Sequence, residues 1–220
     1  DQFQYAFSGL QGDGNVVARL ISAQSPDSQT GIMIRNGADS SSAFVALSVN
    51  NGGVYLLGRS VYGAEASVLA SNSGKTQLPV WLKLMRQGNN FSAYTSPAGG
   101  NWTQLGDIYG NPMSVSVSIA QAVSAGLLPG ASLQSPPNTA AFDSVAVTSA
   151  QSGFWLSSAA ATVLSQPNAA ATTKITSIGT SGFADPIDLS IMGLPSGITA
   201  GFSPVSVTGS GSSSLSLSLD

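Results

Sequence analysis

Apolar and polar residues alternate with a period of two along many short segments of this chain. In the clearest segment, 80–85, Val and Leu residues alternate with Trp81, Lys83 and Met85. A period of two predicts a strand with one apolar face and one mixed face. Residues 87–90 then supply a turn, because Gly and Asn accept a positive φ at little cost. The sequence therefore predicts a β-hairpin at the centre of the chain.

The same alternation predicts strands along the whole chain. The expected strands of the first two thirds are 2–7, 16–23, 31–36, 43–49, 54–60, 67–70, 80–85, 91–94, 113–122 and 139–147, with a turn at 9–15 and a loop at 126–138. The last third adds 154–156, 172–178, 187–192, 198–202 and 213–219. No segment has a 3.6-residue amphipathic pattern long enough for a helix. We therefore expect an all-β protein.

Composition narrows the classes of partner. Of the 220 residues, 42% are hydrophobic and only 8% are charged, with 25 Gly and 11 Pro, which argues against disorder. The net charge is −3, from 7 basic and 10 acidic residues, without any basic run, which argues against a nucleic-acid partner. No apolar run could span a bilayer, so membrane insertion is not expected. The Ser-, Thr- and Gly-rich composition favours a secreted or cell-surface bacterial protein, and the abrupt start at Asp1 suggests a piece of a longer one.

The residue inventory argues against catalysis. The chain has no His and no Cys, which excludes Ser-His-Asp and Cys-His mechanisms, thiolate or His-ligated metal sites, and disulfides. Glycosidases need two carboxylates that flank the bond, and the only Glu of the chain is Glu65, in a small, polar segment. Residue types alone leave a Tyr- or Lys-based lyase open. We expect a non-catalytic protein without a cofactor.

Three segments of the first two thirds carry a family resemblance. They are GIMIRN at 31–36, WLKLMRQGNNFSAYTSPAGGNW at 81–102 and AFDSVAV at 141–147. They are spread from residue 31 to residue 147. Through them, residues 1–148 are similar to the concanavalin A-like, LamG-like jelly-roll domains of bacterial extracellular proteins, a group that includes the DUF1349 families. The resemblance implies a concanavalin-like jelly-roll sandwich at 1–148.

The last third carries a second resemblance. The segment GFADPIDLSIMGLPSGITAGFSPVSVTGSGSSSLSLSL at 182–219 resembles bacterial immunoglobulin-like repeats. Such repeats normally continue with one or two further strands. The resemblance therefore implies a linker at 149–153 followed by a smaller, incomplete immunoglobulin-like β-sandwich at 154–220.

The alternation and the first resemblance together suggest a ligand face. The concave face of a jelly roll is a common ligand surface, and sugar sites combine aromatic faces with a few polar groups. If the mixed faces of three strands coincide, their cations lie together beside Tyr55 and Trp81. The expected ligand-binding residues are Arg35, Arg59, Lys83, Tyr55 and the loop residue Tyr62. An alternative remains open, in which the Arg residues lie at strand ends in solvent or pair with Asp27, Asp39 or Asp107.

A structural calcium ion is a further alternative. Jelly-roll binding modules often hold calcium through loop carboxylates and backbone carbonyls. Asp13, between two Gly residues, and Asp143, in AFDSVAV, are the candidate ligands. No spacing approaches that of an EF-hand loop, so the sequence assigns no metal site.

Two functions follow as hypotheses. The first is a non-catalytic carbohydrate-binding or adhesion module of a larger secreted or cell-surface bacterial protein, with a polysaccharide or another glycan as its partner. The alternative is a structural subunit or spacer of an extracellular fibre or repeat array. In that case a neighbouring chain donates a strand to the unfinished second domain, since an open sheet edge is unfavourable unless something covers it. Self-association through the second domain belongs to this alternative.

Overall fold

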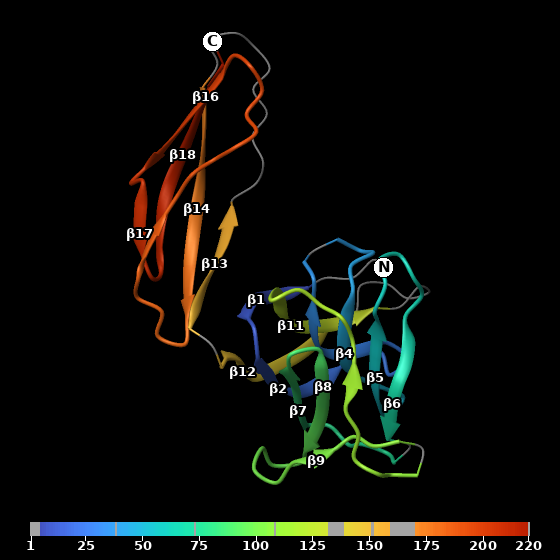
Figure 1. The fold of residues 1–220 in the computed structure, drawn as a ribbon. Coiled ribbons are helices and arrows are strands. Elements are labelled where there is room, and N and C mark those ends of the chain that lie inside the picture. Colours follow the sequence, from blue (N-terminus) through green and yellow to red (C-terminus); the bar gives the residue numbers. More distant parts are fainter. Residues whose placement is uncertain are drawn as a thin grey trace. The chain divides into compact units, whose positions relative to one another are not determined.

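The computed structural model describes residues 5–37, 39–72, 74–107, 109–131, 139–150, 152–158 and 170–219. These residues form antiparallel strands without any helix (Figure 1), which confirms the all-β class. Within these ranges there is accordingly no helix that is long and apolar enough to cross a membrane. The chain divides into two compact units, Asp1–Gln151 and Ser152–Asp220, and this boundary falls inside the predicted linker.

The first unit is a jelly-roll sandwich of two antiparallel sheets. Sheet A has the order β1-β11-β3-β4-β5-β6 and consists of β1 (Ala6–Gln11), β11 (Ala122–Ala131), β3 (Gln29–Arg35), β4 (Phe44–Asn50), β5 (Gly53–Arg59) and β6 (Ser67–Asn72). Sheet B has the order β10-β8-β7-β2-β12, with β9 beside β8, and consists of β10 (Val115–Ser116), β8 (Asn90–Ser96), β7 (Val80–Gln87), β2 (Gly14–Ala23), β12 (Ala140–Ser149) and β9 (Thr103–Gln104). Strands that are distant in sequence are thus neighbours in both sheets.

The main core of the first unit lies between the two sheets. Each strand contributes its alternate apolar residues, as the period of two requires. The buried residues include Ile32, Ile34, Val45, Leu47 and Leu56 from sheet A and Val16, Leu20, Leu82, Leu84 and Phe91 from sheet B. Full burial of one such side chain stabilises the fold by about 1.5–3 kcal/mol. The central hairpin is confirmed, since β7 pairs with β8 across Gly88, whose φ is 60°.

Two expectations about the first unit are wrong. The expected loop at 126–138 begins too early, because β11 continues to Ala131, and residues 132–138 lie outside the described part. The expected strand 113–122 pairs only at β10 and at Ala122, where β11 begins, although Val117 and Ile119 between them are buried. Buried and exposed residues do alternate there, but a strand also requires a neighbouring strand to which its backbone can hydrogen-bond along its whole length.

The start of the chain differs from expectation in a smaller way. The expected first strand, 2–7, falls partly on residues 1–4, which lie outside the described residues. β1 runs on to Gln11, so the turn into β2 is confined to Gly12 and Asp13 rather than beginning at Gly9.

The second unit contains a four-stranded and a two-stranded sheet. The larger sheet has the order β13-β14-β18-β16, with β13 (Gly153–Ser158), β14 (Ala170–Thr180), β18 (Gly211–Leu219) and β16 (Ile198–Ser203). The smaller sheet pairs β15 (Pro186–Asp188) with β17 (Ser206–Thr208). Only the start of the predicted strand 187–192 is therefore a strand, and β17 was not predicted. The buried large apolar residues described in this unit are Ile187, Val207 and Leu215.

Candidate functional site

Two of the predicted ligand-binding residues share one row on the outward face of sheet A. Arg35 pairs in register with Phe44, which pairs with Arg59. The guanidinium carbons of Arg35 and Arg59 lie 5.9 Å and 5.2 Å from the centroid of the Phe44 ring. The prediction that these two Arg residues share a face is confirmed.

A loop covers this row of residues. Arg35 is only 1% exposed and Arg59 only 7%. The Arg35 guanidinium donates a hydrogen bond to the Asp39 carbonyl oxygen, and that of Arg59 donates to the Ser40 carbonyl oxygen at 2.6 Å. Burial lowers the pKa of Arg35, as does the nearby charge of Arg59. Both side chains therefore fasten the loop after β3 and present little surface to a ligand.

The two predicted Tyr residues lie on the same side of the sandwich. Tyr55 is half-buried and packs on the small apolar cluster of Met33 and Leu57. Tyr62 is 68% exposed, and its hydroxyl donates a hydrogen bond to the Asp39 carboxylate at 3.0 Å. The hydrogen bond from the Ser41 backbone and the one from Tyr62 lower the pKa of Asp39. Tyr62 is thus the most accessible of the predicted binding residues.

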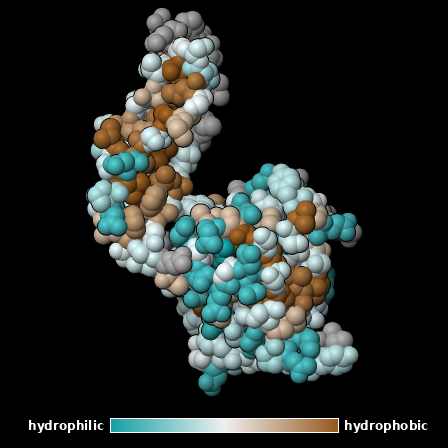
Figure 2. Space-filling view, in the orientation of Figure 1, coloured by the Kyte–Doolittle hydropathy of each residue, from teal (hydrophilic) through white to brown (hydrophobic). Residues whose placement is uncertain are grey.

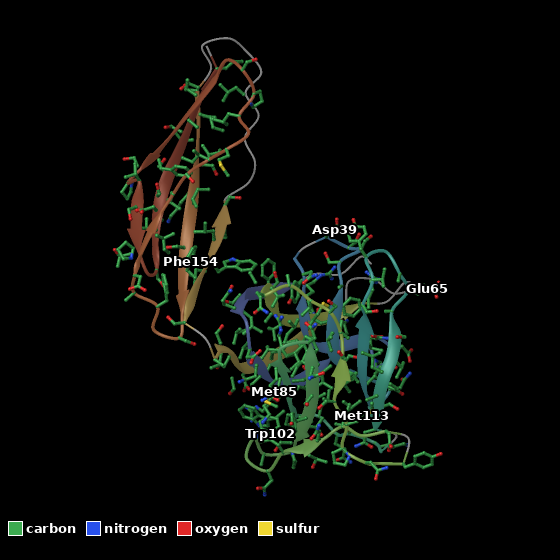
Figure 3. All side chains as sticks on the ribbon, viewed as in Figure 1. Asp39, Glu65, Met85, Trp102, Met113 and Phe154 are labelled. Carbon is green, nitrogen blue, oxygen red and sulfur yellow. The ribbon has the colours of Figure 1, made fainter. Side chains whose placement is uncertain are left out.

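Lys83 does not join this group, and the expectation that three cations share one face is wrong. Lys83 lies on β7, which pairs with β2 and β8 in sheet B. Alternation assigns a residue to one face of its strand, but it does not say to which sheet the strand belongs. In Figure 3, Met85, which lies on the same face of β7 as Lys83, and Trp102 are labelled in the lower part of the first unit, whereas Asp39 is labelled at its upper edge.

A different set of residues gathers around Lys83. The strand registers place Trp81 between Ser96 and Arg19 in one row, and Lys83 between Tyr94 and Val17 in the next. These residues point away from the core. We call this outward surface of sheet B the aromatic face, and its members are Arg19, Trp81, Lys83, Tyr94, Trp102 and Asp143.

Cation–π contacts connect the members of the aromatic face. The Lys83 ammonium lies 4.6 Å from the Tyr94 ring centroid and 4.5 Å from that of Trp102. The Arg19 guanidinium carbon lies 5.7 Å from the Trp81 ring centroid. Such contacts are worth about 0.5–1 kcal/mol each where solvent has access. All three aromatic residues are half-buried, so their rings are held in place and still reach the surface.

A two-point ion pair lies beside Trp81. Arg19 Nε donates to Asp143 Oδ1 at 2.8 Å, and Arg19 Nη2 contacts Asp143 Oδ2. This pairing lowers the pKa of Asp143, chiefly through the hydrogen bond, and raises that of Arg19. The two side chains are 37% and 43% exposed. The pair therefore presents fixed donors and acceptors at the surface.

The turn after β8 fixes the position of Trp81. Ser96 Oγ accepts a hydrogen bond from the Gly99 backbone N–H at 3.0 Å. Gly99 has a φ of 79°, and a Cβ there would lie 2.8 Å from the Trp81 ring. Both the positive φ and the close approach require Gly. The turn thus lies against Trp81 and leads directly to Trp102.

The calcium alternative receives no support from a ligand cluster. Asp13 accepts a hydrogen bond from the Gly88 backbone N–H at 2.6 Å, and Asp143 is paired with Arg19. No group of three acidic, His or Cys residues that could hold a metal occurs in the described parts of the chain. A structural calcium ion stays a prediction.

Sequence reasoning did not assign Arg19, Tyr94 or Trp102 to a site. Pairing the two strands of the predicted hairpin would have placed Tyr94 opposite Lys83. Arg19 and Trp102 reach the site through the β2–β7 register and through a turn, and no local pattern reports either of these.

Comparison with known proteins shows likeness of fold only. No family model matches the sequence, and no curated protein matches it. A functionally unknown protein from Saccharomyces cerevisiae is 12% identical over 67% of this chain and 75% of its own, with a TM-score of 0.52. A mutant of a GH43 protein from Bacillus licheniformis is 16% identical over 59% of this chain and 26% of its own, with a TM-score of 0.42. Sheep galectin-11 in complex with glycerol is 8% identical over 67% and 98%, with a TM-score of 0.38. The finer resemblances, to DUF1349 and to immunoglobulin-like repeats, stay predictions.

Proposed function

We propose that the first unit is a non-catalytic glycan-binding module and that the aromatic face is its binding surface. The observation that carries the proposal is the set of half-buried rings, Trp81, Tyr94 and Trp102, that alternate with cations on one sheet face. Sugars present apolar C–H faces to aromatic rings and hydroxyls to polar groups. The Arg19–Asp143 pair offers both donors and acceptors to such hydroxyls.

The weakly charged, Ser-, Thr- and Gly-rich composition supports a module of a larger secreted or cell-surface bacterial protein.

The outward face of sheet A is the weaker candidate for the binding surface. Contact with the Arg35 and Arg59 guanidiniums would require movement of the loop that contains Ser40, because that loop covers them. Removing either guanidinium would also release the loop, so Arg-to-Ala variants would not separate binding from folding. Tyr62 is exposed and makes the better probe of that side.

The experiment measures the retardation of the full chain in native gels that contain a panel of soluble polysaccharides. Trp102→Ala should weaken binding of any retarding polysaccharide by about tenfold or more, since loss of a central aromatic contact commonly costs above about 1.4 kcal/mol. Tyr62→Ala should leave the affinity unchanged, and thermal unfolding should show that both variants are folded.

Two results would overturn the assignment. Loss of binding in Tyr62→Ala with normal binding in Trp102→Ala would move the site to sheet A. Absence of retardation by every polysaccharide, for a chain that is folded, would remove the glycan-binding function itself.

A second candidate function rests on the second unit. Among the described residues of this unit, large apolar side chains are more often exposed than buried, and Phe154 and Leu156 on β13 are 38% and 44% exposed. Figure 2 shows hydrophobic surface along this unit. Surfaces of this kind mark interaction sites. We therefore propose, as the alternative, a structural subunit of an extracellular fibre or array in which a strand of a second copy covers this surface.

A further inference from the structure

The charges of the aromatic face do not balance. Among the described residues on the outward side of sheet B, the charged side chains are Arg19, Lys83 and Asp143. Asp143 neutralises Arg19 through their two-point pair. The described residues give Lys83 two ring contacts and no ion pair. One positive charge is therefore left on this face of a chain whose net charge is −3.

The Lys83 ammonium is also held in one place. The Tyr94 and Trp102 rings lie 4.6 Å and 4.5 Å from it, and the side chain is half-buried. An ammonium has three N–H donors, and two rings leave at least one of them for an acceptor. A partly desolvated cation without a counter-charge gains more from an approaching anion than a fully hydrated one does.

From this arrangement we infer that the module recognises an acidic sugar, whose anionic group binds the Lys83 ammonium while the sugar ring lies on Tyr94 or Trp102. This inference rests on the proposed glycan-binding function and specifies its ligand. A carboxylate of a uronic acid and a sulfate ester share the required chemistry. Bulk attraction cannot supply the preference, because the whole chain is negatively charged and such long-range attraction is screened beyond about 8–10 Å in salt.

The test compares polymers that differ only in charge. Binding of the full chain to polygalacturonate and to the same polymer with its carboxylates methyl-esterified is measured by calorimetry at physiological salt. A second pair, dextran sulfate and dextran, tests the sulfate source. We expect at least one acidic polymer to bind about tenfold more tightly than its neutral form, and the pair that does so identifies the anionic group.

The variants assign this preference to one residue. Lys83→Gln should remove the preference, so that this variant binds the charged and the neutral polymer of a pair equally, whereas Lys83→Arg should retain the preference. Lys75→Gln is the matched control, because it removes the same charge from an exposed loop residue. It should keep the preference.

The outcomes separate the inference from the function on which it rests. Equal binding of charged and neutral polymers, or a preference that survives in Lys83→Gln, overturns the inference and leaves glycan binding in place. Absence of binding to all four polymers and to the polysaccharide panel overturns both.

Discussion

Most Arg residues of the first unit donate hydrogen bonds to backbone carbonyl oxygens of loops. Their guanidinium groups are therefore not available to a ligand. Arg35 and Arg59 donate to carbonyl oxygens of the loop after β3. Arg86 is buried as well and donates to the carbonyl oxygens of Gly88 and Ile119, at 2.8 Å and 3.3 Å. A guanidinium has five N–H donors, which suits it to several carbonyls at once. Among the described residues, the charges on the outward side of sheet B are accordingly those of Arg19, Lys83 and Asp143.

The Arg19–Asp143 ion pair on the aromatic face predicts a lowered pKa for Asp143. The pKa of Asp143 should lie below its ordinary value near 3.9, because Arg19 donates hydrogen bonds to the carboxylate. Arg19→Met should raise that pKa toward the ordinary value. Since the folded-state pKa is the lower one, the contribution of the pair to stability is complete above about pH 4. It is lost as the pH falls through the folded-state pKa.

Carboxyl carbon NMR titration of the full chain measures this shift. Asp107 is the internal control, because its pKa is lowered by hydrogen bonds from the side chain and backbone of Asn111 rather than by Arg19. Arg19→Met should leave the titration of Asp107 unchanged. An Asp143 titration that is the same in both proteins would show that the pair does not persist in solution.

At the scale of residues, the sequence predicts which face of its strand a side chain occupies. It does not predict to which of the two sheets that strand belongs. Alternation correctly placed Trp81, Lys83 and Met85 on one face of their strand. It could not place Lys83 apart from Arg35, because layer membership depends on pairings between strands that are distant in sequence. Burial of Arg35 also depends on a loop that no local pattern describes.

At the scale of elements, β11 shows that Gly can lie inside a strand, where two backbones approach closely, as well as in a turn. The sequence predicts a loop that begins at Gly126, yet Gly126 lies within β11, which pairs with both β1 and β3. Gly126 is buried there, and a Cβ on it would lie 2.1 Å from the Ala6 carbonyl oxygen. Gly within a strand often marks such a close approach of two backbones. Composition alone does not distinguish this use from a turn.

This close approach predicts a large effect for a small substitution. Gly126→Ala should destabilise the first unit by roughly 1–3 kcal/mol or more, because the new methyl group meets backbone that cannot turn aside. Gly100→Ala is the matched control, since a Cβ at Gly100 meets nothing within 4 Å and its φ is not in the left-handed region. Chemical denaturation of both variants measures the difference. Equal stabilities would mean that β1 and β11 separate at little cost.

At the scale of the whole molecule, the two units differ in how well they cover their apolar surface. The first unit encloses a core between two sheets of similar size. In the second, the described strands form one sheet of four strands and a smaller sheet of only β15 and β17. Most strands of both units were predictable from alternation. The amount of uncovered surface was not, because it depends on which strands find partners.

The uncovered surface predicts self-association through the second unit. The full chain, of 22.1 kDa, should show an average mass that rises with concentration in light scattering. Leu156→Lys should keep the chain monomeric, because a charge on this half-exposed strand position opposes burial against a second copy. Val61→Lys is the control, since Val61 is more exposed and lies in a loop of the first unit.

Association of this kind would also change how the aromatic face works. A second copy brings a second binding surface, so a dimer should bind a polymeric glycan more tightly than a monomer does, without any new contact to the sugar. Leu156→Lys should then weaken binding to a long polymer and leave binding to a short oligosaccharide unchanged. A wild-type mass of 22.1 kDa at all concentrations would remove the fibre or array alternative and leave a monomeric glycan-binding module.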